Sequence, residues 1–245
     1  MNRDKNKEIQ VFDTAEQLSD AAASLIIELS DQALRERGRF LLSLSGGRTP
    51  EQLYHTLASP PARDRLQWDK TYVFWGDERC LPMDNPENNA FMARQVLLSK
   101  TVIPSENIFP MPVNLTPAGA AKAYEQTISD FFGHEEPRFD CMLLGLGADA
   151  HTASLFPGTM AVHDKEHLVA EQYVEEVQMF RVTMTAPLIN NSRNIIFLVA
   201  GKTKAHALQQ VMTAAFDPDK YPAQLIQPVD GNIYWLVDKE AAALL

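Results

Sequence analysis

The sequence predicts an α/β fold in which a mainly parallel sheet is packed between layers of helices. Short apolar runs at residues 40–44, 72–75, 141–144, 195–199 and 233–237 have the length and bulk of buried strands. Segments with helical periodicity separate these runs, and such alternation is typical of a parallel sheet. A chain of 245 residues can bury one sizeable core, so we expect a single α/β domain spanning residues 1–245.

The remaining elements follow in order along the chain. Residues 9–12 predict a short first strand, after which Asp13 or Thr14 caps a long helix that ends near Gly38. That helix is indicated by apolar residues at helical spacing: Leu18, Ala22, Leu25, Ile26 and Leu29. We expect further helices over residues 50–57, 86–98, 117–132 and 203–213, and two more strands within residues 161–185.

Composition limits the partners that the chain can have. Lys and Arg total 22 against 32 Asp and Glu, which gives a net charge of -10. This balance argues against nucleic acid and anionic membranes as partners. The polar first residues do not resemble a signal peptide, the apolar runs are too short to span a bilayer, and two cysteines make no disulfide framework. We therefore expect a cytoplasmic protein, as a monomer or weak homodimer.

A glycine-rich loop after the strand at residues 40–44 has the features of an anion site. Ser45, Gly46, Gly47 and Arg48 precede Thr49, which we expect to cap the next helix with Pro50 at its first position and Gln52 completing a capping box. Backbone N–H groups of such a loop, together with the positive end of a helix, can bind a phosphate. A plain strand-to-helix turn is the alternative.

Two other strand ends carry basic residues. The strand at residues 195–199 leads to Gly201, Lys202 and Lys204, and lysine in a first helical turn opposes the helix dipole unless an anion lies nearby. The strand at residues 72–75 leads to Asp77, Glu78 and Arg79, where Arg79 could bind a phosphate or a developing oxyanion if the loop faces the same crevice. Solvated lysines and a surface ion cluster are the simpler interpretations of these two segments.

The loop over residues 145–158 is the best candidate for a catalytic segment. Asp149 and His151 are two residues apart, and a carboxylate can orient an imidazole so that its other nitrogen deprotonates water. A purely structural histidine fits this spacing equally well. The loop also matches G-x-G-x-x-A, but Pro157 and Gly158 interrupt the helix that a dinucleotide site requires, so NAD binding is disfavoured.

Taken in order, these loops resemble the 6-phosphogluconolactonase family. The similarity spans about residues 8 to 240 and lies in residues 44–50, Gly76 to Arg79, Asn89, residues 145–158, residues 181–183, and Gly201 with Lys204. It implies a Rossmann-like, three-layer αβα fold shared with glucosamine-6-phosphate deaminases and ribose-5-phosphate isomerases. It also implies that a sugar-phosphate lactone, 6-phospho-D-glucono-1,5-lactone, is hydrolysed in the oxidative pentose phosphate pathway.

The resemblance assigns roles residue by residue. His151 would be the general base, Asp149 its orienting partner, and Arg79 a catalytic cation. The substrate-binding residues that it implies are Ser45, Gly46, Gly47, Arg48, Thr49, Asp77, Asn89, Arg181 and Lys204. It implies no metal and no cofactor. The chain departs from the family at Ala150, where the family usually has glycine, and alanine would be strained there if the position needs a positive φ.

Three other functions deserve comparison. A related sugar-phosphate deaminase or isomerase is disfavoured because such deaminases carry a glutamate where this chain has Phe156. A non-catalytic sugar-phosphate sensor would not need His151. Sensors that resemble this fold carry an attached DNA-binding module, whereas this chain is acidic. The motif His163-x-x-Glu166-His167 matches a metalloprotease pattern but lies in a polar stretch, and Cys80 beside Arg79 lacks a partner histidine.

Overall fold

The structure is a computed structural model that describes residues 7–245; the six residues before them, part of the polar N-terminal segment, lie outside the described residues. Its main feature is a six-stranded sheet in the order β1-β9-β8-β5-β2-β3, and every neighbouring pair is parallel. The strands are β1 (Lys7–Phe12), β2 (Phe40–Leu44), β3 (Thr71–Trp75), β5 (Cys141–Gly145), β8 (Asn194–Val199) and β9 (Asn232–Asp238). The predicted parallel sheet is confirmed.

A second, antiparallel sheet has three strands in the order β4-β7-β6. They are β4 (Asp77–Arg79), β7 (Met179–Met184) and β6 (Val169–Val174). The two strands predicted within residues 161–185 are therefore confirmed. Residues 77–79, which we expected to be a loop, are instead a strand, because they pair with a segment of the chain that lies about a hundred residues later.

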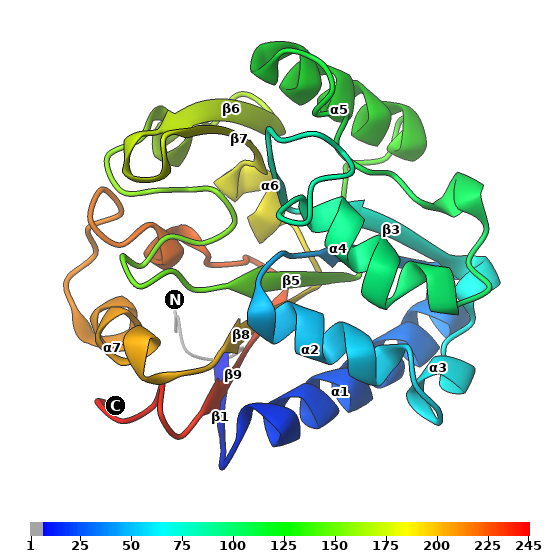
Figure 1. The fold of residues 1–245 in the computed structure, drawn as a ribbon, viewed down its shortest axis with the longest axis horizontal. Helices are drawn as coiled ribbons and strands as arrows, with labels where there is room; N and C mark the ends of the chain where they lie inside the picture. The colour runs from blue at the N-terminus through cyan, green and yellow to red at the C-terminus, as the bar shows by residue number, and fades with distance from the viewer. Residues whose placement is uncertain (1–6) are drawn as a thin grey trace.

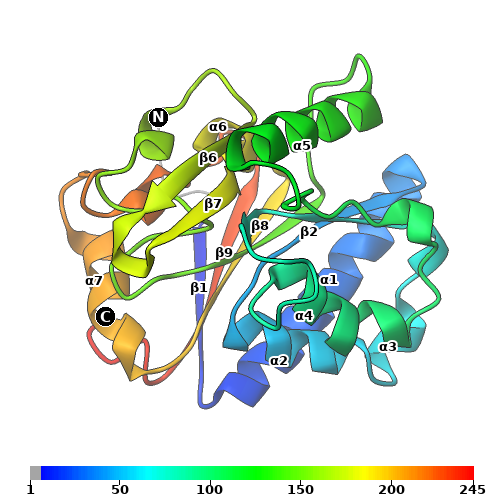
Figure 2. The ribbon, with the colours of Figure 1, turned by 45° about the horizontal axis from the view of Figure 1, so that its top comes forward.

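Helices cover the large sheet on both sides, with α1 and α2 on one side and α5 and the small sheet on the other (Figures 1 and 2). The α-helices are α1 (Ala15–Arg37), α2 (Arg48–Leu57), α3 (Ala62–Arg65), α4 (Asn89–Val96), α5 (Pro117–Phe132), α6 (Ala186–Asn190) and α7 (Ala205–Thr213). Short 3-10 helices include Leu98–Lys100, Lys202–Lys204 and Pro222–Leu225. This is the three-layer α/β architecture that the sequence predicts.

The central strands are mainly apolar because both of their faces are covered. All five residues of β2 and all six of β8 are buried. Aromatic rings fill the space between the layers: Phe197 stacks on Trp235 with centroids 3.8 Å apart, and Phe74 stacks on Phe109 at 4.6 Å. Full burial of one such side chain contributes about 1.5–3 kcal/mol, so these rings fix the sheet firmly against its helices.

The ends of α1 are as predicted, whereas the start of α2 is not. Thr14 caps α1 by accepting a hydrogen bond from the Gln17 N–H, and Gly38 ends it with φ of 71°. The expected cap at Thr49 is wrong, because the helix begins at Arg48 and Gly47 is the N-cap with φ of 104°. Gly47 turns the chain earlier than a residue with a side chain could, so the predicted capping box does not form.

Two more helices differ from their predicted bounds. The segment predicted as one helix over residues 86–98 is α4 plus a 3-10 turn, because the Asn88 side chain caps α4 by accepting a hydrogen bond from the Phe91 N–H at 2.9 Å. The helix predicted from residue 203 begins with the 3-10 turn Lys202–Lys204 and continues as α7. Both differences concern only the bounds of helices. The loops expected at the carboxyl edge of the sheet still lie there.

Candidate active site

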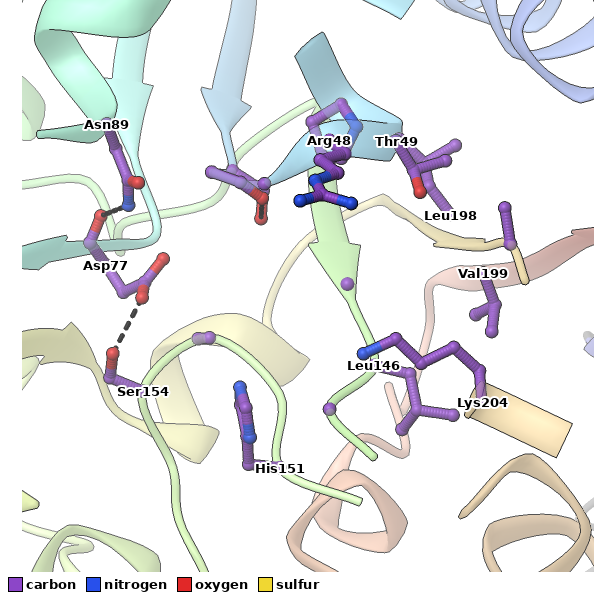
Figure 3. Close-up of a pocket in the computed structure, with 18 of the residues that line it drawn as sticks. Arg48, Thr49, Asp77, Asn89, Leu146, His151, Ser154, Leu198, Val199 and Lys204 are labelled. Atoms are coloured by element: carbon purple, nitrogen blue, oxygen red, sulfur yellow. Dashed lines mark hydrogen bonds between the residues drawn. The ribbon is translucent and has the colours of Figure 1, made fainter. Parts of the chain in front are cut away.

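A cavity of about 590 Å³ lies where the carboxyl ends of β2, β5 and β8 meet the small sheet (Figure 3). Ligands bind at this edge of open α/β sheets. The predicted site residues that line the cavity are Ser45, Gly46, Gly47, Arg48, Thr49, Asp77, Arg79, Asn89, His151, Arg181 and Lys204. Asp149 does not line the cavity itself but contacts His151. Segments far apart in the chain thus converge on one hollow, as the hydrolase hypothesis requires.

The glycine-rich loop sits tightly against the start of α4. A Cβ added at Gly46 would lie 1.9 Å from Oδ1 of Asn89, so only glycine fits there. Asn89 is held in turn by the Asp77 backbone, whose carbonyl accepts a hydrogen bond from Nδ2 at 3.0 Å. The Ser45 N–H donates to the buried Tyr54 hydroxyl at 2.9 Å. These contacts hold residues 45–48 open toward the cavity, with the N-terminus of α2 behind them.

Arg79 and Arg181 bring two positive charges to the opposite wall. They are directly opposed in the antiparallel pair of β4 and β7, where like charges repel. Nε of each guanidinium is buried and makes no hydrogen bond to the described residues, although Arg79 Nη1 donates to the Glu87 carbonyl. Burial lowers the pKa of Arg181, and Asp77 acts in the opposite direction. This arrangement is suited to an anion that would satisfy both guanidinium groups.

The two carboxylates beside Arg79 have different surroundings. Asp77 lines the cavity, and its Oδ2 accepts a hydrogen bond of 2.7 Å from the buried Ser154 hydroxyl. Glu78 points away from the cavity, is fully buried, and accepts hydrogen bonds from the backbone N–H groups of Arg79, Asn89 and Ala90. Burial raises the pKa of Glu78 to about 7. Glu78 therefore holds the start of α4 in place, and only Asp77 is available to a ligand.

His151 and Asp149 form the pair that the sequence predicts. Nδ1 of His151 is 2.6 Å from Oδ1 of Asp149, and the same oxygen accepts a hydrogen bond from the His151 N–H at 3.2 Å. Partial burial acts to raise the pKa of Asp149, but the hydrogen bonds and charge of His151 outweigh it and lower that pKa. Asp149 thus contacts the Nδ1 side of the ring and leaves Nε2 as its other polar atom, and the ring points into the cavity (Figure 3).

Gly147 leaves the space that this pair occupies. A Cβ at Gly147 would lie 2.1 Å from Nδ1 of His151 and 2.3 Å from Oδ1 of Asp149. The Gly147 N–H also donates to the His151 carbonyl at 2.8 Å, which closes the loop on itself. Close packing around the imidazole thus explains Gly147, without a dinucleotide, whereas a Cβ at Gly145 would meet nothing within 4 Å.

Ala150, where the family usually has glycine, adopts φ of 67°. It is buried, and its carbonyl accepts a hydrogen bond from the Ala223 N–H at 3.0 Å. The position therefore requires the left-handed conformation, and alanine is strained there at a cost of about 1–2 kcal/mol. His151 still reaches its partner and the cavity, so the strain is absorbed without displacing the imidazole.

Only one of the two lysines after β8 reaches the site. The Lys204 ammonium points into the cavity from the side opposite His151, and the Arg48 guanidinium enters the same cavity from another side (Figure 3). Burial lowers the pKa of Lys204, while the charge of Asp149 acts to raise it. Lys202 is exposed and does not line the cavity, so of the two lysines expected beside an anion only Lys204 lies at the cavity.

Sequence reasoning missed two residues of the site. Ser154 holds Asp77, and Phe156 stacks against the imidazole of His151 with ring centroids 3.9 Å apart. Both lie within the predicted catalytic loop, but nothing in their spacing shows that they contact these partners. The cavity also has an apolar wall, formed by Leu146, Phe156, Val177, Leu198 and Val199.

The described residues form no site for the other candidate chemistries. His163 contacts Asp219 and His167 contacts Asp164, so the two histidines of the metalloprotease pattern point to separate carboxylates. Within residues 7–245 no group of three or more His, Cys, Asp and Glu side chains could hold a metal ion. Burial raises the pKa of Cys80 to about 11, which disfavours a reactive thiolate.

The fold and the cavity define an α/β protein with a hollow lined by basic residues and a histidine at the carboxyl edge of a parallel sheet. The family model described as glucosamine-6-phosphate isomerases/6-phosphogluconolactonase matches residues 13–235. The chain belongs to this family.

Individual relatives narrow the comparison. The chain is 44% identical over 214 residues to a 6-phosphogluconolactonase of Synechocystis sp., an alignment that covers 86% of both chains. The solved 6-phosphogluconolactonase of Trypanosoma brucei is 28% identical, with a TM-score of 0.87 and coverage of 98% of both chains. A monomeric glucosamine-6-phosphate deaminase, 23% identical with a TM-score of 0.83, covers 97% of this chain and 100% of its own, and shares the fold.

The predicted resemblance to 6-phosphogluconolactonases, which are lactone hydrolases, is therefore confirmed. As to membranes, none of the helices between residues 7 and 245 combines the length and the apolar character that crossing a bilayer requires.

Proposed function

We propose that this protein hydrolyses 6-phospho-D-glucono-1,5-lactone to 6-phospho-D-gluconate in the oxidative pentose phosphate pathway of the cytoplasm, with His151 as the general base. One observation carries the proposal: the imidazole paired with Asp149 faces a cavity that also holds Arg48, Arg79, Arg181 and Lys204. An imidazole beside several cations suits a reaction in which water attacks a phosphorylated ester.

The substrate phosphate would bind at the glycine-rich loop. Backbone N–H groups of residues 46–49, at the N-terminus of α2, can donate to phosphate oxygens, and Arg48 and Lys204 extend toward the same space (Figure 3). Arg79 and Arg181 supply further positive charge on the opposite wall, while Asp77 and Asn89 present acceptors and donors to sugar hydroxyls. A net charge of -10 makes this local concentration of cations necessary for binding an anion.

The chemical steps follow from the position of Nε2. His151 Nε2 takes a proton from water as the water oxygen bonds to the lactone carbonyl carbon, and Asp149 stabilises the resulting imidazolium. Arg79 or a backbone donor stabilises the negative oxygen of the tetrahedral intermediate. The bond between the carbonyl carbon and the ring oxygen then breaks, and the imidazolium returns its proton to that oxygen. The new carboxylic acid ionises to solvent, and no cofactor takes part.

The test is hydrolysis of 6-phosphogluconolactone at controlled pH, corrected for spontaneous opening of the ring. We expect His151→Ala to lower kcat by 10²-fold or more, as is typical of a general base, and to leave 6-phosphogluconate affinity nearly unchanged. His134→Ala is the matched control, because His134 is exposed and does not line the cavity. Turnover by His151→Ala at the wild-type rate would refute the role of His151, and binding without turnover by the wild type would favour a sensor.

A further inference from the structure

Ser154 lines the cavity and connects the loop that carries His151 to the small sheet. It is three residues after His151 in a tight turn in which the Leu155 N–H donates to the Thr152 carbonyl at 2.9 Å. Thr152 also donates through Oγ1 to the Gly145 carbonyl at 2.8 Å, which fixes the turn to the end of β5. Ser154 therefore sits at a fixed position relative to His151.

Every polar group of Ser154 is used to contact the small sheet. Its hydroxyl donates to Asp77 Oδ2 at 2.7 Å, and its N–H donates to Thr183 Oγ1 at 3.2 Å. Its carbonyl accepts a hydrogen bond from the Gln172 side chain. These three partners come from β4, β7 and β6, so one fully buried serine joins the catalytic turn to all three strands.

The contact with Asp77 bears on ligand binding. Among the described residues only Ser154 donates a hydrogen bond to the Asp77 carboxylate, and it does so at Oδ2. The other oxygen, Oδ1, is left for a group in the cavity that Asp77 lines. A short bond to an ionised acceptor is stronger than an ordinary one, and it fixes the rotation of the carboxylate. Figure 3 shows Ser154 and Asp77 joined at the edge of the hollow.

We propose that Ser154 is a positioning residue that orients the Asp77 carboxylate toward a hydroxyl group of the sugar-phosphate substrate. This inference rests on the proposed function for the identity of the substrate. Ser154 does not line the reacting atoms as a base or nucleophile, because its hydroxyl is committed to Asp77. Ser154 contributes to substrate binding only through Asp77. Its contribution should therefore disappear when Asp77 is replaced by a residue without a carboxylate.

The experiment is a double-mutant cycle of Ser154→Ala and Asp77→Ala, measured as kcat/KM for the lactone. We expect Ser154→Ala alone to lower kcat/KM about ten-fold or more, mainly through KM, because a lost hydrogen bond to a charged group has an effect of this size. In the Asp77→Ala background, Ser154→Ala should change kcat/KM less than about two-fold. Equal losses in both backgrounds, or no loss in either, would overturn the proposal.

Two further variants separate positioning from stability. Ser154→Cys keeps nearly the same volume with a weak donor, so it should fold and still show most of the loss. Ser30→Ala removes a buried hydroxyl on α1 that has no hydrogen-bond partner among the described residues, and it should leave both KM and kcat unchanged. A lower thermal midpoint for Ser154→Cys with wild-type KM would show a merely structural serine.

The outcome stays interpretable if the proposed activity is wrong. The same cycle is measured as the Kd of 6-phosphogluconate by calorimetry, which does not depend on turnover. A wild type that binds this ligand without hydrolysing the lactone contradicts the proposed function alone. Additive losses of affinity in the cycle contradict the role of Ser154 alone.

Discussion

Arg79 and Arg181 occupy directly opposed positions on β4 and β7, and both line the cavity that His151 faces. Like charges at opposed positions destabilise an antiparallel pair. The buried Nε atoms of both residues make no hydrogen bond to any part of the chain between residues 7 and 245, which adds to the cost. The pair is therefore expected to limit the stability of the empty protein and to stabilise a bound anion.

We expect Arg181→Gln to weaken the binding of 6-phosphogluconate at least ten-fold without lowering the thermal midpoint. The substitution removes one charge of the opposed pair, so repulsion falls while the anion loses a partner. Calorimetry and thermal unfolding measure the two effects. Lys202→Gln is the control, since it removes the same charge from an exposed residue outside the cavity. Equal affinity losses in both variants would mean that only net charge matters.

Gly147→Ala should abolish turnover nearly as completely as His151→Ala. Its Cβ would lie 2.1 Å from Nδ1 of His151, so the imidazole must move away from Asp149. The hydrolysis assay measures this, with Gly145→Ala as the control, because a Cβ at Gly145 meets nothing within 4 Å. A Gly147→Ala variant with normal kcat would show that the His151–Asp149 contact is dispensable.

Ala150→Gly should stabilise the protein by about 1 kcal/mol, because glycine adopts a φ of 67° without strain. Turnover should stay equal or increase, since the loop already places His151 correctly. Urea unfolding measures the change. Ala148→Gly, in the same loop but without a positive φ, should instead lose stability through the entropy of the unfolded chain. Destabilisation by Ala150→Gly would mean that the buried methyl group contributes more than the strain costs.

Glu78 should make stability fall as pH rises from about 4.5 to about 7. Burial raises its pKa in the folded state to about 7, so over this range the folded protein holds a proton that the unfolded chain has released. The stability that Glu78 contributes is complete below pH 4.5 and is lost through pH 7, by about 3 kcal/mol in total. Urea unfolding of wild type and Glu78→Gln at pH 5 and pH 8 should show the wild type losing more. A constant difference between them would contradict the shifted pKa.

Local patterns in the sequence were sufficient to predict most of the helices and strands. The ends of α1 at Thr14 and Gly38 and the bounds of α5 follow from capping residues and from Pro117 at a first helical position. The start of α2 was predicted wrongly because Gly47 adopts φ of 104°, a backbone angle that its sequence neighbours do not specify. The strand β4 was missed because three residues become a strand only when β7 lies beside them.

For the site, the sequence determined which candidate residues are present and which predicted strand each of them follows. Glycines at positions 46, 47 and 147, a histidine two residues after an aspartate, and basic residues after buried strands are local features. Only tertiary structure decided that Arg79 opposes Arg181, that Asn89 covers Gly46, and that Ser154 holds Asp77 from 77 residues away. These contacts depend on strand register and on how the loops close. Both are set by side chains that are distant along the chain, so no local sequence pattern predicts the contacts.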